Sequence, residues 1–176
     1  MAEQKGWLLK EDSNRGYRRV VASPLPITIL EADTIKKLVS DDVIVIAGGG
    51  GGIPVVREEE EEEEEEDGSF SGIESVIDKD LSSCKIAQEI DADILMILTD
   101  VDHVFVNYGK PDQKALGNIT IAEIEEHIEA GQFAKGSMGP KVAAALEFAK
   151  AGGQSYICSL DQAANALKGE SGTVIS

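Results

Sequence analysis

Short apolar runs alternate along this chain with stretches whose apolar residues recur at helical spacing. The apolar runs at residues 43–47, 94–98, 156–158 and 172–175 predict strands. The run at 94–98 is almost wholly apolar, which is typical of a strand buried on both faces. Strands that alternate with helices favour a parallel sheet covered by helices, so the pattern predicts an α/β fold with three αβα layers and a mostly parallel, open sheet.

The intervening stretches predict amphipathic helices. Residues 31–39 place Ile35, Leu38 and Val39 on one side. A second helix is predicted from apolar positions three or four residues apart, namely Ile77, Leu81, Cys84, Ala87 and Ile90. Asp78 precedes this helix at the position where a carboxylate caps the first free backbone N–H groups. The sequence therefore predicts both the buried face and the start of the second helix.

Three further helices are predicted toward the C-terminus. Thr120 and Glu123 have the spacing of a capping box, and the helix that they open is expected to end at Gly131. Residues 141–150 form the next helix, with Pro140 in its first turn. Its inward residues are predicted to be Val142, Ala145, Leu146 and Ala149. A short helix at 161–168 is expected to end before Gly169.

The length of 176 residues suffices for one domain with a hydrophobic core. Cys84 and Cys158 form no CxxC pair and are interpreted as small buried thiols. His103 and His127 are isolated from acids and nucleophiles, and we predict no metal-binding or catalytic role for either. No apolar stretch is long enough to span a bilayer and the N-terminus shows no apolar signal core, so we expect a cytoplasmic protein.

The acidic residues are distributed unevenly. The formal net charge is −17, of which Glu58 to Glu66 and Asp67 contribute ten negative charges, leaving −7 for the rest of the chain. An acidic protein is a poor partner for nucleic acid or an anionic membrane, and we expect neither. Adjacent like charges repel and bury nothing apolar, so residues 57–69 are predicted to form a disordered acidic loop.

Three lysines and a glycine run point to phosphoryl chemistry. Lys79 and Lys141 each stand at a predicted helix start, where backbone N–H groups and the helix dipole also attract anions. Lys10 lies among acids near the N-terminus. The glycines Gly49, Gly50, Gly51 and Gly52 follow the apolar run at 43–47, so a strand is expected to lead into a backbone that can approach a ligand closely.

The acids beside these lysines are open to more than one interpretation. Asp80 either holds the lysines in place by charge-assisted hydrogen bonds or only complements the dipole of its own helix. Asp100 and Asp102 follow the predicted strand at 94–98, at the sheet edge where ligands of α/β proteins bind. They could contact a ribose, the shell of a magnesium ion or only solvent.

Ten short motifs, in order and over nearly the whole chain, resemble those of the carbamate kinases of the amino acid kinase family. They occupy residues 6–7, 10–12, 15–21, 23–24, 49–54, 76–80, 98–101, 108–109, 131–133 and 136–141. The acidic run is the one stretch without a counterpart. The resemblance implies reversible phosphoryl transfer between ATP and carbamate, usually run from carbamoyl phosphate and ADP toward ATP, with Mg²⁺.

By the same resemblance, individual residues acquire expected roles. Lys10, Lys79 and Lys141 match the lysines that stabilise the transferred phosphate, and Asp80 matches the acid that organises them. Gly49 to Gly52 match a glycine-rich loop near the transferred group. The segments that resemble the nucleotide pocket contain Thr99, Asp100, Val101, Tyr108 and Met138. No protein-held metal ligand is predicted.

Family members are roughly twice as long, so the resemblance also implies that the front half, with its first strand and Ala-Leu-Gly-Gly-Asn-type loop, is absent. Residues 1–26 are then the remnant of a protruding subdomain, and 27–176 form the nucleotide-binding α/β domain. A sheet without its neighbouring strands would expose an unpaired edge, which favours association, and we expect a homodimer. Two alternatives stay open: a shortened paralogue or fragment that binds nucleotide without turnover, and a kinase whose acceptor is a carboxylate.

Overall fold

The structure is a computed structural model that describes residues 7–11, 16–58, 69–134 and 136–176. Its centre is a four-stranded sheet in the order β5-β9-β10-β8. The strands are β5 (Ile94–Thr99), β9 (Gln154–Ser159), β10 (Thr173–Ile175) and β8 (Asn118–Ile119). β5 pairs with β9 in parallel and β10 with β8 in parallel, whereas β9 and β10 are antiparallel. The predicted α/β fold with a mostly parallel sheet is confirmed.

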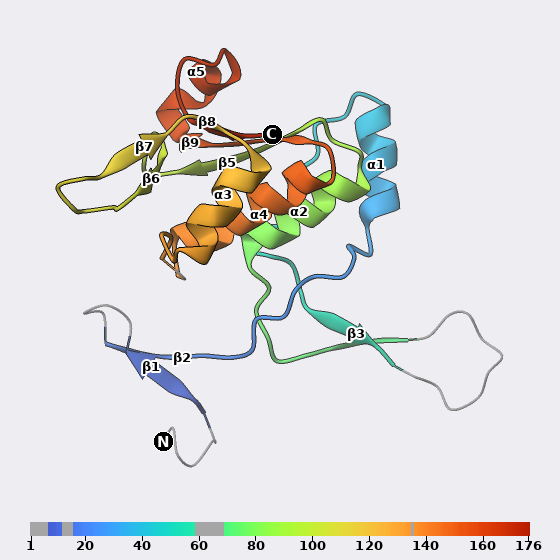
Figure 1. Ribbon diagram of the computed structural model, residues 1–176. Coiled ribbons are helices and arrows are strands. Elements are labelled where there is room, and N and C mark those ends of the chain that lie inside the picture. Colours follow the sequence, from blue (N-terminus) through green and yellow to red (C-terminus); the bar gives the residue numbers. More distant parts are fainter. Residues whose placement is uncertain (1–6, 12–15, 59–68, 135) are drawn as a thin grey trace.

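Helices cover the sheet on both faces (Figure 1). They are α1 (Ala32–Ser40), α2 (Lys79–Glu89), α3 (Ile121–Glu129), α4 (Met138–Lys150) and α5 (Ala163–Leu167), the last preceded by the 3₁₀ turn η2 (Leu160–Gln162). α2, α3 and α4 lie on one face, α5 lies on the other, and α1 packs beside α2. The three-layer arrangement predicted from the alternating pattern is therefore present.

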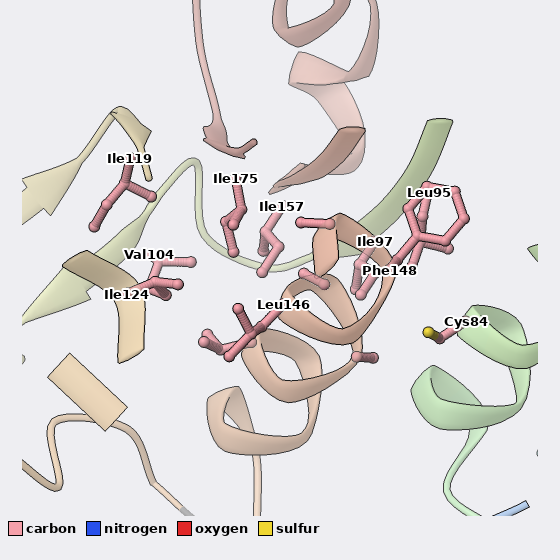
Figure 2. Close-up of a cluster of buried hydrophobic side chains, with 14 of the residues drawn as sticks. Cys84, Leu95, Ile97, Val104, Ile119, Ile124, Leu146, Phe148, Ile157 and Ile175 are labelled. Atoms are coloured by element: carbon pink, nitrogen blue, oxygen red, sulfur yellow. The ribbon is translucent and has the colours of Figure 1, made fainter. Parts of the chain in front are cut away.

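Each face of the sheet carries its own apolar cluster. The larger one packs inward-facing strand residues against the helices α2, α3 and α4, and includes Leu95, Ile97, Ile157, Leu146 and Phe148 (Figure 2). The smaller cluster lies under α5 and contains Tyr156, Cys158, Ala166 and Val174. Along β9, Tyr156 and Cys158 thus face one layer and Ile157 the other, as a strand between two layers requires.

The predicted helix ends agree with the observed capping. The Asp78 side chain accepts hydrogen bonds from the backbone N–H groups of Asp80 (2.8 Å) and Leu81 (3.4 Å) at the start of α2. Thr120 and Glu123 form both hydrogen bonds of the capping box that opens α3. α4 begins at Met138, three residues earlier than predicted, and all four residues predicted to face inward on it are buried.

The predicted strand at residues 43–47 is wrong. These residues form no strand, and the side chains of Ile44 and Ile46 are 95% and 98% exposed. A strand exists only when its backbone N–H and C=O groups pair with a neighbour, and no strand in the described ranges pairs with this segment. The apolar sequence alone could not supply that neighbour.

The prediction that the strand at 94–98 is buried on both faces is also wrong in part. Leu95 and Ile97 are buried, but Ile94 and Leu98 on the opposite face are 43% and 40% exposed. β5 is the edge strand of the sheet, and α5 packs over β9 instead of over β5. This face of β5 is therefore only partly covered among the described residues, with Met96 packed against the cluster under α5 and Ile94 and Leu98 left exposed.

Three antiparallel hairpins were not predicted. They pair β1 (Leu9–Glu11) with β2 (Tyr17–Arg19), β3 (Val55–Arg57) with β4 (Phe70–Gly72), and β6 (Val104–Val106) with β7 (Lys114–Leu116). Figure 1 shows the first two standing away from the sheet and its helices. Their strands of three residues are too short to give a clear period in the sequence.

The predicted disordered loop at 57–69 is wrong at its ends. Arg57 belongs to β3, the backbone N–H of Glu58 donates to the carbonyl of Ser69 (2.9 Å), and the Ser69 hydroxyl donates to the Glu58 carboxylate (2.8 Å). The β3–β4 hairpin therefore extends to both ends of the acidic run. Residues 59–68, where the rest of this prediction falls, lie outside the described residues.

Both cysteines are buried and free, as predicted. Burial of Cys84 between its own helix α2 and α4, with a smaller contribution from the negative charge of Glu147, raises the pKa of this thiol to about 11. Burial also raises the pKa of Cys158. Across the described ranges, no helix has the length and apolar character needed to cross a membrane.

Candidate active site

Two helix N-termini meet at one edge of the sheet. α2 leads through a short turn into β5, and α4 leads in the same way into β9, so both helices begin at the edge where these parallel strands end. The two helices pack against each other. Their free backbone N–H groups and the positive ends of their dipoles therefore lie at one edge, an arrangement suited to an anion.

Asp80 joins the two helices through two lysines. Its Oδ2 lies 2.9 Å from Nζ of Lys141, at the start of α4, and 3.2 Å from Nζ of Lys79, in its own helix. Asp80 is buried, the Lys141 side chain is largely buried, and the Lys79 side chain is about half exposed. Asp80 thus lies in the first turn of α2 and also pairs with both lysines, which combines the two interpretations left open by the sequence.

Lys79 interacts with the negative charges of two carboxylates, Asp80 and Asp78. Desolvation lowers the pKa of Lys79, but its hydrogen bond to Asp80 and the negative charge of Asp80 outweigh this effect, so the pKa is raised. Lys79 is therefore an ammonium ion at neutral pH. The negative charge of Asp78 also acts on Lys79, so attraction of a phosphate depends on the ammonium groups together with the backbone N–H groups at the two helix starts and not on a net positive charge of the cluster.

The glycine loop lies against the start of α2. Gly51 has φ +126°, and a Cβ atom built on it would be 2.2 Å from the carbonyl oxygen of Ile77, so only glycine fits there. The hydroxyl of Ser82 donates to the carbonyl of Gly51 (2.7 Å) from a fully buried position in α2. The loop predicted to approach a ligand is thus fixed beside Lys79 and Asp80.

Sequence reasoning missed Ser82. It is a buried polar residue, and its neighbours one helical turn away are mostly charged, namely Asp78, Lys79, Lys85 and Ile86. The sequence therefore contained no sign of its burial. Nothing in its spacing indicated that its partner would be Gly51, which lies 31 positions away.

Lys10 stands apart from the other two predicted lysines. It lies in β1, opposite Arg18 of β2, and Figure 1 shows this hairpin away from the starts of α2 and α4. Within the part of the chain that the structure describes, no hydrogen bond or ion pair joins Lys10 to Asp80. The hairpin is tied to the rest of the protein by an ion pair between Arg19 and Glu74 and by a bridge between Ala22 and Ser75.

The residues predicted for a nucleotide pocket are spread along the same edge of the sheet. Thr99 ends β5 and its hydroxyl donates to Asp100 (3.1 Å), with Val101 next in the bend. Met138 is the first residue of α4 and packs against the core. Tyr108 lies beyond β6, largely exposed, with its ring centroid 6.0 Å from that of Phe105.

Asp102 has a protein partner at this edge. Its carboxylate accepts a hydrogen bond of 2.5 Å from the hydroxyl of Ser159, which links the ends of β5 and β9. Of the two acids that follow β5, Asp102 therefore has a structural task, and Asp100 is bonded to its own neighbour Thr99.

The family follows from comparison with known proteins. The model of the amino acid kinase family matches residues 4–159, which is most of the sequence. The chain belongs to the amino acid kinase family. The matched span includes Lys10, the glycine loop and the cluster of Lys79, Asp80 and Lys141, so these residues lie within the family's own fold.

Within this family the chain is similar to carbamate kinases. A carbamate kinase of Thermococcus kodakarensis is 51% identical over 176 residues, an alignment that covers 99% of this chain and 53% of the relative. One of Staphylococcus haemolyticus is 51% identical over 175 residues, covering 98% and 54%. The chain therefore spans about half the length of the curated relatives it matches.

Solved structures give the same result. The carbamate kinase of Giardia lamblia bound to AMP-PNP superposes with a TM-score of 0.87 at 46% identity, covering 99% of this chain and 53% of that one. A protein of Aeropyrum pernix, known as project APE1968, has a TM-score of 0.87 at 39% identity, covering 99% and 54%. The α/β arrangement is thus that of the matching half of these two solved structures.

Proposed function

We propose that this chain carries the phosphate-binding machinery of a carbamate kinase, which transfers a phosphoryl group reversibly between ATP and carbamate. The observation that carries the proposal is the convergence of Lys79 and Lys141, from the starts of two separate helices, on the buried carboxylate of Asp80. The similarity to carbamate kinases supplies the substrate class. In the direction of ATP formation, carbamoyl phosphate and ADP give ATP and carbamate, which then decomposes.

The proposed roles follow from the demands of phosphoryl transfer, in which a protein mainly aligns donor and acceptor and neutralises the moving group. Lys79 and Lys141 stabilise the equatorial oxygens of that group, and Asp80 fixes the two ammonium groups in place. The backbone of Gly49 to Gly52, which lies beside the start of α2, also approaches the phosphates. Lys10 would act as the third lysine only in an arrangement in which its hairpin lies nearer to the cluster.

The nucleotide is proposed to bind beside this cluster, along the edge formed by the ends of β5 and β9. The protein contacts are assigned to Thr99, Asp100, Val101, Tyr108 and Met138. Mg²⁺ belongs to the nucleotide substrate in this scheme. No group of three or more His, Cys, Asp or Glu side chains within the described ranges could hold a metal ion, and Mg²⁺ commonly binds through substrate phosphates.

A coupled assay of ATP formation from carbamoyl phosphate and ADP tests the proposal. We expect Lys141→Ala to lower kcat by about 10²–10³-fold, because it removes one preorganised charge from the transition state. Lys150→Ala is the matched control, since Lys150 ends the same helix and pairs with Glu125 at the far side. Equal rates in Lys141→Ala and the control would exclude the assigned role of Lys141.

Binding of nucleotide without turnover is a second candidate. Two observations favour it: Lys10 lies away from the other two lysines, and this chain aligns with only about half of the length of its relatives. Calorimetry with ADP would then show binding that is weakened by Lys141→Ala, while the coupled assay shows no ATP. Turnover by this chain would exclude this candidate.

Two finer points of the proposal need their own measurements. Replacing carbamate by acetylglutamate, aspartate or glutamate in an ATPase-coupled assay distinguishes a carboxylate acceptor from carbamate. Sedimentation velocity tests the predicted homodimer.

A further inference from the structure

The tip of the β6–β7 hairpin, residues 107–113, is held in one shape by side-chain hydrogen bonds. The backbone N–H of Gly109 donates to Oε1 of Gln113 (2.7 Å), and the side chain of Asn107 donates to Asp112 (2.8 Å). Asn107 has a φ of +53°, which is uncommon for a residue other than glycine. Such a conformation persists only where the surrounding groups fix it. The tip, which carries Tyr108, therefore has a defined structure.

One hydrogen bond connects this tip to a distant part of the chain. The backbone N–H of Asn107 donates to Oε1 of Gln132, which is 2.9 Å away and 25 positions later in the sequence. Both residues are half-buried. Asn107 directly precedes Tyr108, so this bond fixes the stretch of backbone from which the tyrosine side chain extends.

The backbone of Gln132 is itself fixed by the end of α3. The N–H of Gln132 donates to the carbonyl of His127 (3.1 Å), and the N–H of Gly131 donates to that of Ile128 (2.9 Å). These two bonds form a Schellman motif, and Gly131 has the positive φ, +67°, that the motif requires. Gln132 therefore presents its side chain to the tip from a rigid helix end.

The turn that contains Gln132 also lies against the start of α4. The backbone N–H of Gly139 donates to the carbonyl of Ala134 (2.8 Å), and a Cβ atom on Gly139 would lie 2.9 Å from that oxygen. Phe133 packs against the larger apolar cluster. Lys141 follows two residues after Gly139. Gln132 thus lies between the hairpin tip and the helix start that carries one of the two clustered lysines.

We propose that Gln132 is a positioning residue for the nucleotide, which holds the ring of Tyr108 at a fixed place relative to the lysine cluster. The inference rests on the proposed function, in which Tyr108 contacts the nucleotide and Lys141 its phosphates. An exposed aromatic ring is a stacking surface for a base, and Phe105 supports that of Tyr108 at a centroid distance of 6.0 Å. Acting through Asn107, Gln132 determines the preference for a nucleoside diphosphate over a diphosphate without a base.

Calorimetry with ADP and with pyrophosphate tests this inference. Both ligands contain two linked phosphates, but only ADP carries a base. Gln132→Met keeps the length of the side chain and removes the oxygen that accepts from Asn107. We expect the affinity for ADP to fall about tenfold, as for the loss of one hydrogen bond, and the affinity for pyrophosphate to stay unchanged. The ratio of the two affinities therefore falls about tenfold.

Two matched variants show whether the accepted hydrogen bond is the cause. Gln132→Glu keeps an acceptor oxygen, and its added charge acts on the phosphates of both ligands, so the affinity ratio should equal that of the original chain. Gln88→Met removes a side-chain amide that donates to the carbonyl of Glu147 (3.5 Å) near the end of α2, at the opposite edge of the sheet. The ratio should again be unchanged. A tenfold lower ratio in either variant would contradict the role of the Gln132 acceptor.

Amide hydrogen exchange in the ligand-free chain distinguishes positioning from a general loss of structure. Gln132→Met should speed exchange at the N–H of Asn107 and leave exchange in β9 unchanged, whereas Gln132→Glu should leave both unchanged. Unchanged exchange at Asn107 in Gln132→Met would contradict the inference, and so would faster exchange in β9 of the same variant.

Failure of this inference differs from failure of the proposed function. If the original chain binds ADP and Gln132→Met leaves the affinity ratio unchanged, this inference alone is overturned. If the original chain does not bind ADP, the nucleotide assignment in the proposed function is overturned, and this inference is overturned with it.

Discussion

Two regions of this protein contain similar apolar sequences, but their apolar side chains are buried in one region and exposed in the other. In residues 76–176, here called the body, Ile124, Ile157 and Ile175 are completely buried between the sheet and its helices. In residues 23–57, here called the lateral region, Ile35 is the one large apolar residue that is buried among those described. The comparison shows that apolar character does not create a core unless other elements supply a second surface.

Besides the buried side chain of Ile35 and the buried hydrogen bond from Ser82 to Gly51, the lateral region makes polar contacts with α2 and the turn after it. Glu89 accepts hydrogen bonds from the hydroxyl of Thr28 (2.7 Å) and the backbone N–H of Ile29 (3.1 Å), and Lys36 pairs with Asp91. The exposed contacts among these add little stability. We therefore expect the lateral region to open at a lower free energy than the body does.

The comparison is tested most strongly by one pair of isoleucines. Ile157→Ala in the body should lower the free energy of unfolding by about 2–5 kcal/mol, because it leaves a cavity between β9 and the helices. Ile46→Ala in the lateral region should change it by less than about 0.5 kcal/mol, since its side chain is already in solvent. Urea unfolding of both variants measures the difference, and similar losses would mean that Ile46 is buried in solution.

A pair of glycines tests where the lateral region meets α2. Gly51→Ala should cost about 1–3 kcal/mol, because its φ of +126° is strained for alanine and the new methyl group would collide with the carbonyl of Ile77. Gly50→Ala should be almost neutral, since nothing lies within 4 Å of its Cβ position. Thermal or urea unfolding of the two variants gives the comparison. Equal stability would show that the loop does not press on α2.

The smallest expected effect is the pH dependence of the free energy of unfolding that arises from Cys84 in the body. Burial raises the pKa of Cys84 from its ordinary value of 9.0 to about 11, so the folded state keeps a proton that the unfolded state releases. The associated stability is complete below pH 9 and is lost as the pH rises toward 11. By pH 10 the loss amounts to about 1.4 kcal/mol.

The matched variant for this prediction is Cys84→Ala, which removes the titrating group. Urea unfolding of both proteins between pH 8 and about pH 10 should give curves that converge as the pH rises. Parallel curves would show that the Cys84 thiol ionises equally well in both states.

The candidate site shows how far sequence reasoning could go. The helix starts beside Lys79 and Lys141 were predictable, because Asp78 and Pro140 act on neighbouring backbone groups. That both lysines would share Asp80 depended on how α2 packs against α4, which joins residues 61 positions apart. The resemblance to a family suggested that the two lysines pair with Asp80, whereas the spacing of these residues in the sequence could not. The distance of Lys10 from the cluster was not foreseen by either.

The sequence by itself determined the local features: the caps of α2 and α3, the inward residues of α4 and the alternation of strands and helices. Those features depend on interactions within a few residues. The tertiary structure alone decided whether segment 43–47 became a strand, which face of β5 was covered, and which residue Ser82 would bind. Strand pairing and side-chain burial require a second strand or helix from elsewhere in the fold. An apolar pattern shows that a segment can pair or be buried, but it does not show whether that second element is present.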